Sequence, residues 1–444
     1  MTVHKYLKIG IVGLFVILIL VIGIIMLRRL SHDKQVFGED LYMYIPQETP
    51  ALIQINKAKD ADFFGHLFPE LDKVLVAIKS KITYPLLIVK DESPYIVTRV
   101  TFEQEKLIKT VLDKDLFGAF PPKKRVYKGV NIFFYPSVNN DFFVCMFYNG
   151  IFAGGFNYNF LEKIIDTDST NSILNHKDIN DLIKEMNTNY SANMIFRSDS
   201  GFQAFNAAVE NQRLQLSGYI NSDSIDSIWE CSNKHNDSVS VDCSIFPDPL
   251  LSYSINYKES SLSKDFVCFF DPPLYGFCID TVKRAPIYVL KYNTDRFDIF
   301  EKLNRLELSY IQRKLSTKDI VLNRQHIYTT SVNLAKEVFG KDIPVVLTFN
   351  KGYLIFTTNR DVLIDYLKVI DNSQKNYAED NELKNEIGDE DFTVQSFYHI
   401  NDLSQVGNDV HLGYLSLFKY SFKTASITNT RIADRQKVDI ILNN

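Results

Sequence analysis

The sequence predicts an α+β protein in which a single N-terminal transmembrane helix precedes a duplicated exterior region of mainly antiparallel sheet and helices. Three observations carry this prediction. The run of residues 9–27 contains no charged side chain. Beyond it, segments with alternating apolar residues, typical of strands, are interspersed with segments at helical spacing. The same order of segments then recurs in the second half of the chain.

Composition excludes several classes of protein. Of the 444 residues, 45% are apolar and 23% are charged, as in an ordinary globular protein. A largely disordered chain, a collagen-like rod and a polytopic transporter are therefore excluded. The 49 basic and 54 acidic side chains give a net charge of −5, whereas nucleic-acid-binding domains are basic. We expect no nucleic acid as a partner.

The apolar run from Ile9 through Leu18 to Leu27 predicts a membrane anchor. As a helix it rises about 28 Å, close to the hydrocarbon core of about 30 Å. A signal peptide would have a shorter apolar region and a small-residue cleavage site, but here Arg28 and Arg29 follow. A buried core helix fits poorly because no face of the run is polar. We expect a single pass through the inner (cytoplasmic) membrane, with the lipid bilayer as a partner.

The orientation of this anchor is not decided by charge, because basic residues are nearly balanced on its two sides. The general pattern of N-terminal anchors favours a periplasmic C-terminal region. The predicted divisions are 1–35 for the tail, anchor and linker, 36–283 for the first half, and 284–444 for the second half. Each half is expected to end in a β-rich tail.

The first half alternates strands and helices. Helical spacing predicts a helix over 60–79, and Thr101 with Gln104 forms a capping box for a second helix to residue 116. Asn149-Gly150 is a type I′ hairpin signal, followed by a helix over 159–166 and another over 178–186. Strands are expected at 51–55, 85–89, 95–100, 123–127, 130–135, 142–147, 151–156 and 193–196, with a tail over 214–246 and 250–257.

The second half repeats this order. Thr294 caps a helix to residue 311, a turn lies at 350–352, and helices follow over 359–370 and 382–387. Strands are expected at 287–292, 320–322, 326–331, 345–349, 353–357 and 393–398, with a tail over 415–427 and 437–442.

Matching residues support duplication. Gly150 and Gly352 are 202 residues apart, and so are Asn157 and Asn359. Order, turn type and helix cap agree together, so we favour two copies of one unit over the alternative that any two α+β stretches look alike.

No catalytic, cofactor or metal site is readable from motifs. The sequence contains no G-x-S-x-G, H-E-x-x-H, P-loop or C-x-x-C pattern. The eight histidines lack metal-ligand spacing. We therefore predict no catalytic residue, no cofactor and no metal ligand.

The cysteines leave alternatives open. Cys231 with Cys243, or Cys268 with Cys278, could form a disulfide in an exterior domain, or all four could be reduced. Cys145 lies in an apolar strand and is expected to be a buried thiol.

The most unusual segment is an aromatic stretch with two adjacent prolines. Prolines interrupt regular strand pairing and would present the aromatic rings on a stiff loop. The loop is either a ligand or partner patch, or an inter-domain connector that fills the seam between halves. The candidate patch comprises Phe269, Phe270, Pro272, Pro273, Tyr275 and Phe277.

A small basic patch precedes it in the chain. Residues 121–125 with Lys128 form either a solvated turn or a contact for anionic headgroups or polymers.

The chain resembles a family of N-terminally anchored bacterial cell-envelope proteins known only as a domain-of-unknown-function family. The residues carrying the resemblance are 41–46 and 51–55 after the anchor, and the two hairpins at 149–150 and 350–352. The resemblance implies location and fold class, and it supplies no catalytic residue.

The expected function is that of a membrane-anchored, non-catalytic cell-envelope protein. It would bind an unidentified envelope protein, polymer or ligand through its extracytoplasmic region. The alternative is an envelope enzyme, hydrolase-like, whose active-site residues are dispersed in sequence. Convergent carboxylates in a deep cleft, or a His beside a Ser or Cys, would favour the enzyme.

Overall fold

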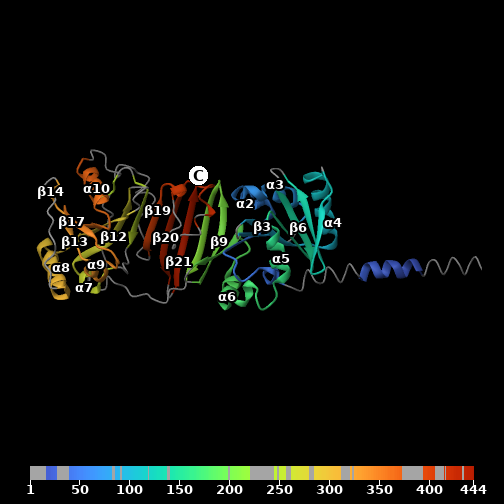
Figure 1. Ribbon diagram of the computed structural model, residues 1–444, viewed down its shortest axis with the longest axis horizontal. Helices are drawn as coiled ribbons and strands as arrows, with labels where there is room; N and C mark the ends of the chain where they lie inside the picture. Colours follow the sequence, from blue (N-terminus) through green and yellow to red (C-terminus); the bar gives the residue numbers. More distant parts are fainter. Residues whose placement is uncertain are drawn as a thin grey trace, which may run out of the picture. The chain divides into compact units, whose positions relative to one another are not determined.

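The chain forms two compact units. Unit 1 comprises Met1–Gln212 with Val410–Tyr414, and unit 2 comprises Arg213–Asp409 with Leu415–Asn444. This division differs from the predicted one at 283/284. The computed structural model (Figure 1) describes residues 17–27, 40–82, 86–90, 93–118, 120–137, 141–198, 201–220, 245–247, 250–256, 262–279, 285–311, 321–322, 325–372, 394–405, 415, 417–432 and 435–444.

The first helix corrects the predicted fold class. Its described part covers residues 17–27, with Leu18 52% and Leu27 67% exposed, and Ile9 lies outside the described residues. Among the described residues no helix is long and apolar enough to span a membrane. The prediction of a transmembrane helix over 9–27 was therefore wrong.

Unit 1 is an antiparallel sheet with the order β4-β5-β6-β7-β3-β2-β1-β8-β9 in its described part. The strands are β1 Ala51–Ile55, β2 Leu86–Lys90, β3 Pro94–Arg99, β4 Lys123–Tyr127, β5 Val130–Pro136, β6 Phe142–Tyr148, β7 Ile151–Gly155, β8 Ala192–Ser198 and β9 Gly201–Glu210. The strand expected at 123–127 is confirmed as β4, so the basic patch divides between this strand and the turn at Lys128.

Helices of unit 1 follow the predicted order, with two local changes. The helix expected over 60–79 is divided into two because Pro69 begins a new one. The capping box of Thr101 and Gln104 is present, and the helix continues as a π-helical turn. The helical segments are η1 Leu41–Tyr44, η2 Ala58–Asp60, α2 Ala61–Leu67, α3 Pro69–Ile78, α4 Phe102–Thr110, η3 Val111–Leu116, α5 Tyr158–Asp166, η5 Ile173–Asn175 and α6 Lys177–Glu185.

Both faces of the unit 1 sheet are buried at its central strands. Leu87 and Val89 share a hydrophobic cluster with Leu161 and Ile164 of α5, which packs on β6 and β7. Ile88 lies between the first two residues in the strand, so it points to the opposite face, and it is also fully buried. Burial on two faces explains why these strands read as continuous apolar runs rather than alternating ones.

A chain of side-chain hydrogen bonds crosses unit 1 from η1 to β9. The Tyr42 hydroxyl donates to Gln54 Oε1 at 2.7 Å, and Gln54 Nε2 donates to Asn56 Oδ1 at 2.8 Å. Asn56 Nδ2 donates to Asn193 Oδ1 at 2.7 Å, and Asn193 Nδ2 donates to Asn206 Oδ1 at 2.8 Å. Tyr42 and Asn193 are buried, so the chain satisfies polar groups that burial would otherwise penalise.

The strands of unit 2 are also antiparallel, with the order β16-β17-β18-β13-β12-β11-β19-β20-β21-β10 in their described part. The strands are β10 Arg213–Ile220, β11 Ser252–Asn256, β12 Phe270–Cys278, β13 Ile287–Tyr292, β16 Tyr328–Thr329, β17 Val346–Asn350, β18 Tyr353–Thr357, β19 Val394–Ile400, β20 Thr424–Ile432 and β21 Arg435–Asn443, with a separate hairpin of β14 Val321–Leu322 and β15 Gln325–His326.

Two apolar clusters cover the faces of the unit 2 sheet. One contains Leu363 and Leu367 of α10, and the other contains Leu303 of α8 and Val338 of α9. The helical segments are α7 Lys264–Val267, α8 Arg296–Ile311, α9 Val332–Phe339, α10 Arg360–Asn372 and η9 Leu403–Gln405. The helix predicted at 382–387 and the pair Cys231 and Cys243 lie outside the described residues.

The two units share a strand order. The run β5-β6-β7-β3-β2-β1-β8-β9 corresponds, strand for strand, to β16-β17-β18-β13-β12-β11-β19-β20. Gly150 and Gly352 both have positive φ, at 74° and 92°. The Asn157 side chain accepts from the backbone of Asn159, and that of Asn359 accepts from Asp361. Turn, cap and order therefore repeat together, as a duplicated unit requires.

Candidate functional site

The predicted aromatic patch lies in a strand rather than a loop. Phe270, Tyr275 and Phe277 are at most 3% exposed in β12, and Pro273 is buried as well. A register shift between Asp271 and Leu274 accommodates the two prolines, so pairing with β13 continues beyond them. Phe269 is half-buried and precedes the strand, which contains Pro272. These rings belong to the core of unit 2, so little of them faces a ligand.

Cys268 lies at the end of α7 and Cys278 at the end of β12. A disulfide between them stays a prediction. Cys145 is fully buried as predicted, and burial raises the pKa of its thiol.

A polar pocket on unit 1 is the candidate site. Its volume is about 500 Å³, and helix α5 supplies four of its lining residues. Asn159, Glu162, Lys163 and Asp166 are spaced i, i+3, i+4 and i+7, which places them on one face of the helix. The remaining lining residues are Pro46, Glu48, Tyr127, Thr167 and Asn171.

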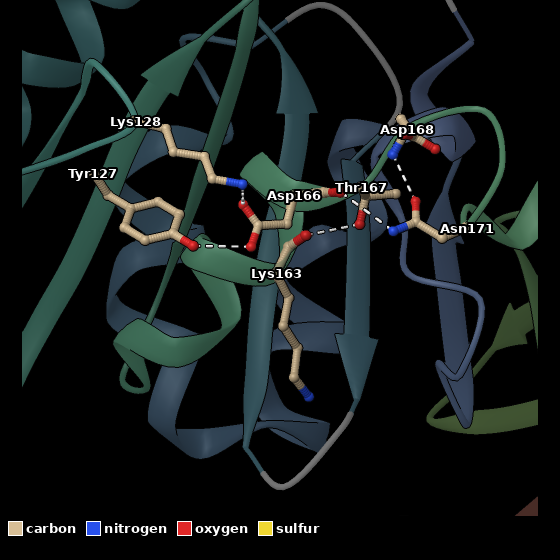
Figure 2. Close-up of polar contacts among 7 residues, drawn as sticks. All are labelled: Tyr127, Lys128, Lys163, Asp166, Thr167, Asp168 and Asn171. Atoms are coloured by element: carbon tan, nitrogen blue, oxygen red, sulfur yellow. Dashed lines mark hydrogen bonds and ion pairs between the residues drawn. The ribbon is translucent and has the colours of Figure 1, made fainter.

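A tight hairpin brings Tyr127 and Lys128 to the end of α5 (Figure 2). Lys128 and Gly129 connect β4 to β5 with φ of 42° and 83°, as a type I′ turn requires. Gly129 adopts such a φ without strain, because it has no Cβ. The turn determines the register of the hairpin, and thereby where the Tyr127 and Lys128 side chains lie.

Asp166 is the centre of the polar contacts at the site. The Tyr127 hydroxyl donates to its Oδ2 at 2.9 Å, and Lys128 Nζ lies 2.8 Å from its Oδ1 (Figure 2). Asp166 is the last residue of α5, where the helix dipole disfavours a negative charge. The Lys128 hydrogen bond is the largest cause that lowers the pKa of Asp166, with a further contribution from Tyr127. The same pair raises the pKa of Lys128, and the bond to Asp166 raises the pKa of Tyr127.

The loop after α5 closes the end of the helix. The Thr167 hydroxyl donates to the Lys163 carbonyl at 2.7 Å, and Asn171 Nδ2 donates to the Asp166 carbonyl at 3.2 Å (Figure 2). Asn171 Oδ1 in turn accepts from the Asp168 backbone at 2.7 Å. Because these carbonyls would otherwise lack intrahelical partners, the loop is held against the helix. Hydrogen bonds from Thr170 lower the pKa of the Asp168 carboxyl.

These shifts argue against acid–base chemistry by Tyr127, Lys128 and Asp166. A general acid or base works best with a pKa near the operating pH. The pKa of Asp166 is moved below its ordinary 3.8, while those of Lys128 and Tyr127 are moved above 10.5 and 10.0. Each shift is away from neutrality, so the three groups keep fixed protonation states and can act as fixed hydrogen-bonding partners.

A histidine beside a serine occurs in unit 2. His399 Nδ1 lies 2.8 Å from Ser426 Oγ, and His399 Nε2 lies 2.8 Å from Asn401 Oδ1. Asn401 Nδ2 donates to the Leu250 carbonyl, which fixes the orientation of its amide. Nε2 therefore donates to Asn401, and Nδ1 accepts from Ser426.

This histidine network is enclosed. His399 and Ser426 are 6% and 8% exposed, they are paired across β19 and β20, and the Tyr253 ring stacks on the imidazole at 5.3 Å. A nucleophile requires access to its substrate. Because His399 and Ser426 are buried, a structural role of this pair is favoured. The pair gives little support to the alternative that the protein is an enzyme.

No group of three or more His, Cys, Asp or Glu side chains is placed to hold a metal in the described part of the chain.

Sequence reasoning did not identify the pocket. The sequence places Lys128 in a basic patch and predicts the helix over 159–166, but neither prediction gives a role to the polar side chains of that helix. Two features of the sequence could have indicated the pocket. They are the polar helix face at 159, 162, 163 and 166, and the Lys128-Gly129 turn. The meeting of Tyr127 with Asp166, 39 residues apart, depends on tertiary packing.

The comparisons with known proteins do not assign the chain. No protein-family model matches the sequence, and no curated protein matches it. Crystal form I of TP0453 is similar to part of it, with a TM-score of 0.29 and 6% identity, covering 43% of this chain and 82% of that one. Crystal form III of TP0453 gives a TM-score of 0.27 and 8% identity, covering 43% and 83%. Similarity at this level carries no argument about fold or function.

Proposed function

We propose that the protein is a non-catalytic binding protein that takes its ligand or partner in the pocket along α5. The observation that supports this is the pocket itself, in which polar side chains of fixed protonation state converge from several chain segments. Preformed concave sites with a few oriented polar groups are typical of ligand recognition. The location in the cell envelope stays a prediction from the sequence.

A photo-crosslinking amino acid at Asn159 tests this function. Asn159 lines the pocket and is exposed, so the substitution should not disturb packing. In cells, we expect a covalent adduct from position 159 but not from Leu107, a 49% exposed residue on α4 that does not line the pocket. Equal labelling at both positions, or none at 159, would contradict the proposal.

A further inference from the structure

We infer that the α5 pocket selects an uncharged, hydroxyl-rich ligand such as an oligosaccharide. The inference rests on the proposed binding function and concerns the ligand class. Its starting point is that the carboxylates on α5 already have cationic partners. Asp166 pairs with Lys128 at 2.8 Å, and Glu162 pairs with Arg125 at 3.0 Å. Neither cation lines the pocket, so the carboxylates face it with their charge balanced from another side.

The carboxylates nevertheless retain hydrogen-bonding capacity. An ionised carboxyl has about four lone-pair sites, and the contacts of Asp166 with Tyr127 and Lys128 occupy two. Glu162 Oε1 is buried and accepts no hydrogen bond from the described residues, although the Arg125 guanidinium lies close to it. That oxygen is closed to solvent, but the Glu162 side chain is 22% exposed and lines the pocket, so its carboxylate stays within reach of a ligand donor. Asn159, Lys163 and Asn171 add donor groups to the same lining, so the pocket presents both acceptors and donors, with the carboxylates of α5 balanced by cations.

Hydroxyl groups meet this requirement better than ions do. A cationic ligand would approach carboxylates that Arg125 and Lys128 already neutralise, and would lose its hydration for little Coulomb gain. An anionic ligand would meet the carboxylates of Glu48, Glu162 and Asp166, which outnumber the cationic Lys163 in the pocket lining. A hydroxyl donates to an acceptor and also accepts, so the amide of Asn159 can contribute a donor in return. These features favour a neutral ligand with several hydroxyls.

Binding of uncharged tetrasaccharides to the immobilised full-length protein tests the inference. The probes are tetrasaccharides of glucose, galactose, mannose and N-acetylglucosamine, with spermine as a cationic probe. We expect saturable binding of at least one sugar, with an affinity that is unchanged between about 0.1 M and 1 M salt, because no charge pairing is screened. Glu162→Gln should weaken it about tenfold or more, since a hydrogen bond to a charged group is lost.

Two further variants make the outcome decisive. Glu70→Gln, an exposed glutamate on α3, should bind as wild type does. Asn159→Ala removes an exposed side chain and should weaken binding even if Glu162→Gln fails to fold. The inference is overturned if no tetrasaccharide binds, or if spermine binds instead and is released by salt. If the crosslink at position 159 persists in that case, the binding function stands and only the ligand class is wrong.

Discussion

Asp166 places a negative charge where the dipole of α5 is also negative. The position is tolerated because Lys128 and Tyr127 contact both carboxylate oxygens. Since the pKa of Asp166 is lowered on folding, its contribution to stability is present above the unfolded value. That contribution is lost as the pH falls through the folded pKa. The pair therefore stays charged throughout the neutral range.

Replacing Lys128 by methionine should raise the pKa of Asp166 toward its ordinary value of 3.8, because the ammonium is the largest cause of the lowering. A carboxyl ¹³C NMR titration measures this directly. Lys184→Met is the matched control, since Lys184 pairs with Asp181 at 3.2 Å on α6. An Asp166 pKa that does not move in Lys128→Met would show that the ion pair is not what lowers it.

Ser426→Ala should destabilise unit 2 by about 1–3 kcal/mol, because His399 Nδ1 is left buried without its donor. Urea unfolding at neutral pH measures the change. Ser404→Ala, whose hydroxyl is exposed and contacts Asp402, should change stability by no more than about 0.5 kcal/mol. If Ser426→Ala leaves the free energy of unfolding unchanged, water must replace the hydroxyl, and this part of the sheet must be accessible to solvent.

At the scale of elements, hairpins and caps were the most predictable features. The Asn149-Gly150 turn and the Thr101 capping box are local, so a few neighbouring residues determine them. The β12 strand was not predicted because its prolines suggested a loop. A register shift absorbs them, and the pairing of β12 with β11 and β13 depends on distant residues.

Gly352→Val should cost about 1–3 kcal/mol, because a β-branched residue is strained at a φ of +92°. An added Cβ would meet no atom within 4 Å, so the cost comes from the backbone rather than from a clash. Gly352→Asn should cost less, since asparagine tolerates left-handed conformations. Thermal or urea unfolding compares the three proteins. Equal losses of stability in Gly352→Val and Gly352→Asn would indicate that side-chain contacts, and not φ, determine the effect.

At the scale of the whole molecule, each unit has a hydrophobic core of its own. The cluster around Leu87 and Leu161 draws only on unit 1, and those around Leu363 and Val338 draw only on unit 2. The offset of 202 residues pointed to this repetition. The packing that brings the α5 pocket together did not follow from it, because the counterpart of α5 in unit 2, α10, carries different polar residues.

A fragment of residues 40–212 should therefore fold by itself, since an independent core is the property of a domain. Cooperative urea unfolding and a dispersed amide NMR spectrum would show this. The full-length protein is the reference, and the Asp166 titration should be the same in both. A fragment that aggregates, or that unfolds without a cooperative transition, would contradict the independence of unit 1.

The chain of hydrogen bonds from Tyr42 to Asn206 has a single direction, because each amide accepts from the preceding group and donates to the following one. Contacts with the backbone hold the same orientations: Asn56 Nδ2 and Asn193 Nδ2 also donate to the Tyr190 and Asn187 carbonyls, and Asn206 Oδ1 also accepts from the Asn187 N–H. Gln54, at the start of the chain, takes its donor from the Tyr42 phenol. Burial raises the pKa of this phenol, so the proton stays in place at physiological pH. Tyr42→Phe should leave Gln54 Oε1 without this donor and cost about 1–3 kcal/mol in urea unfolding. The Asn193 side-chain amide resonances, recorded in the same variant, would report whether two orientations now coexist.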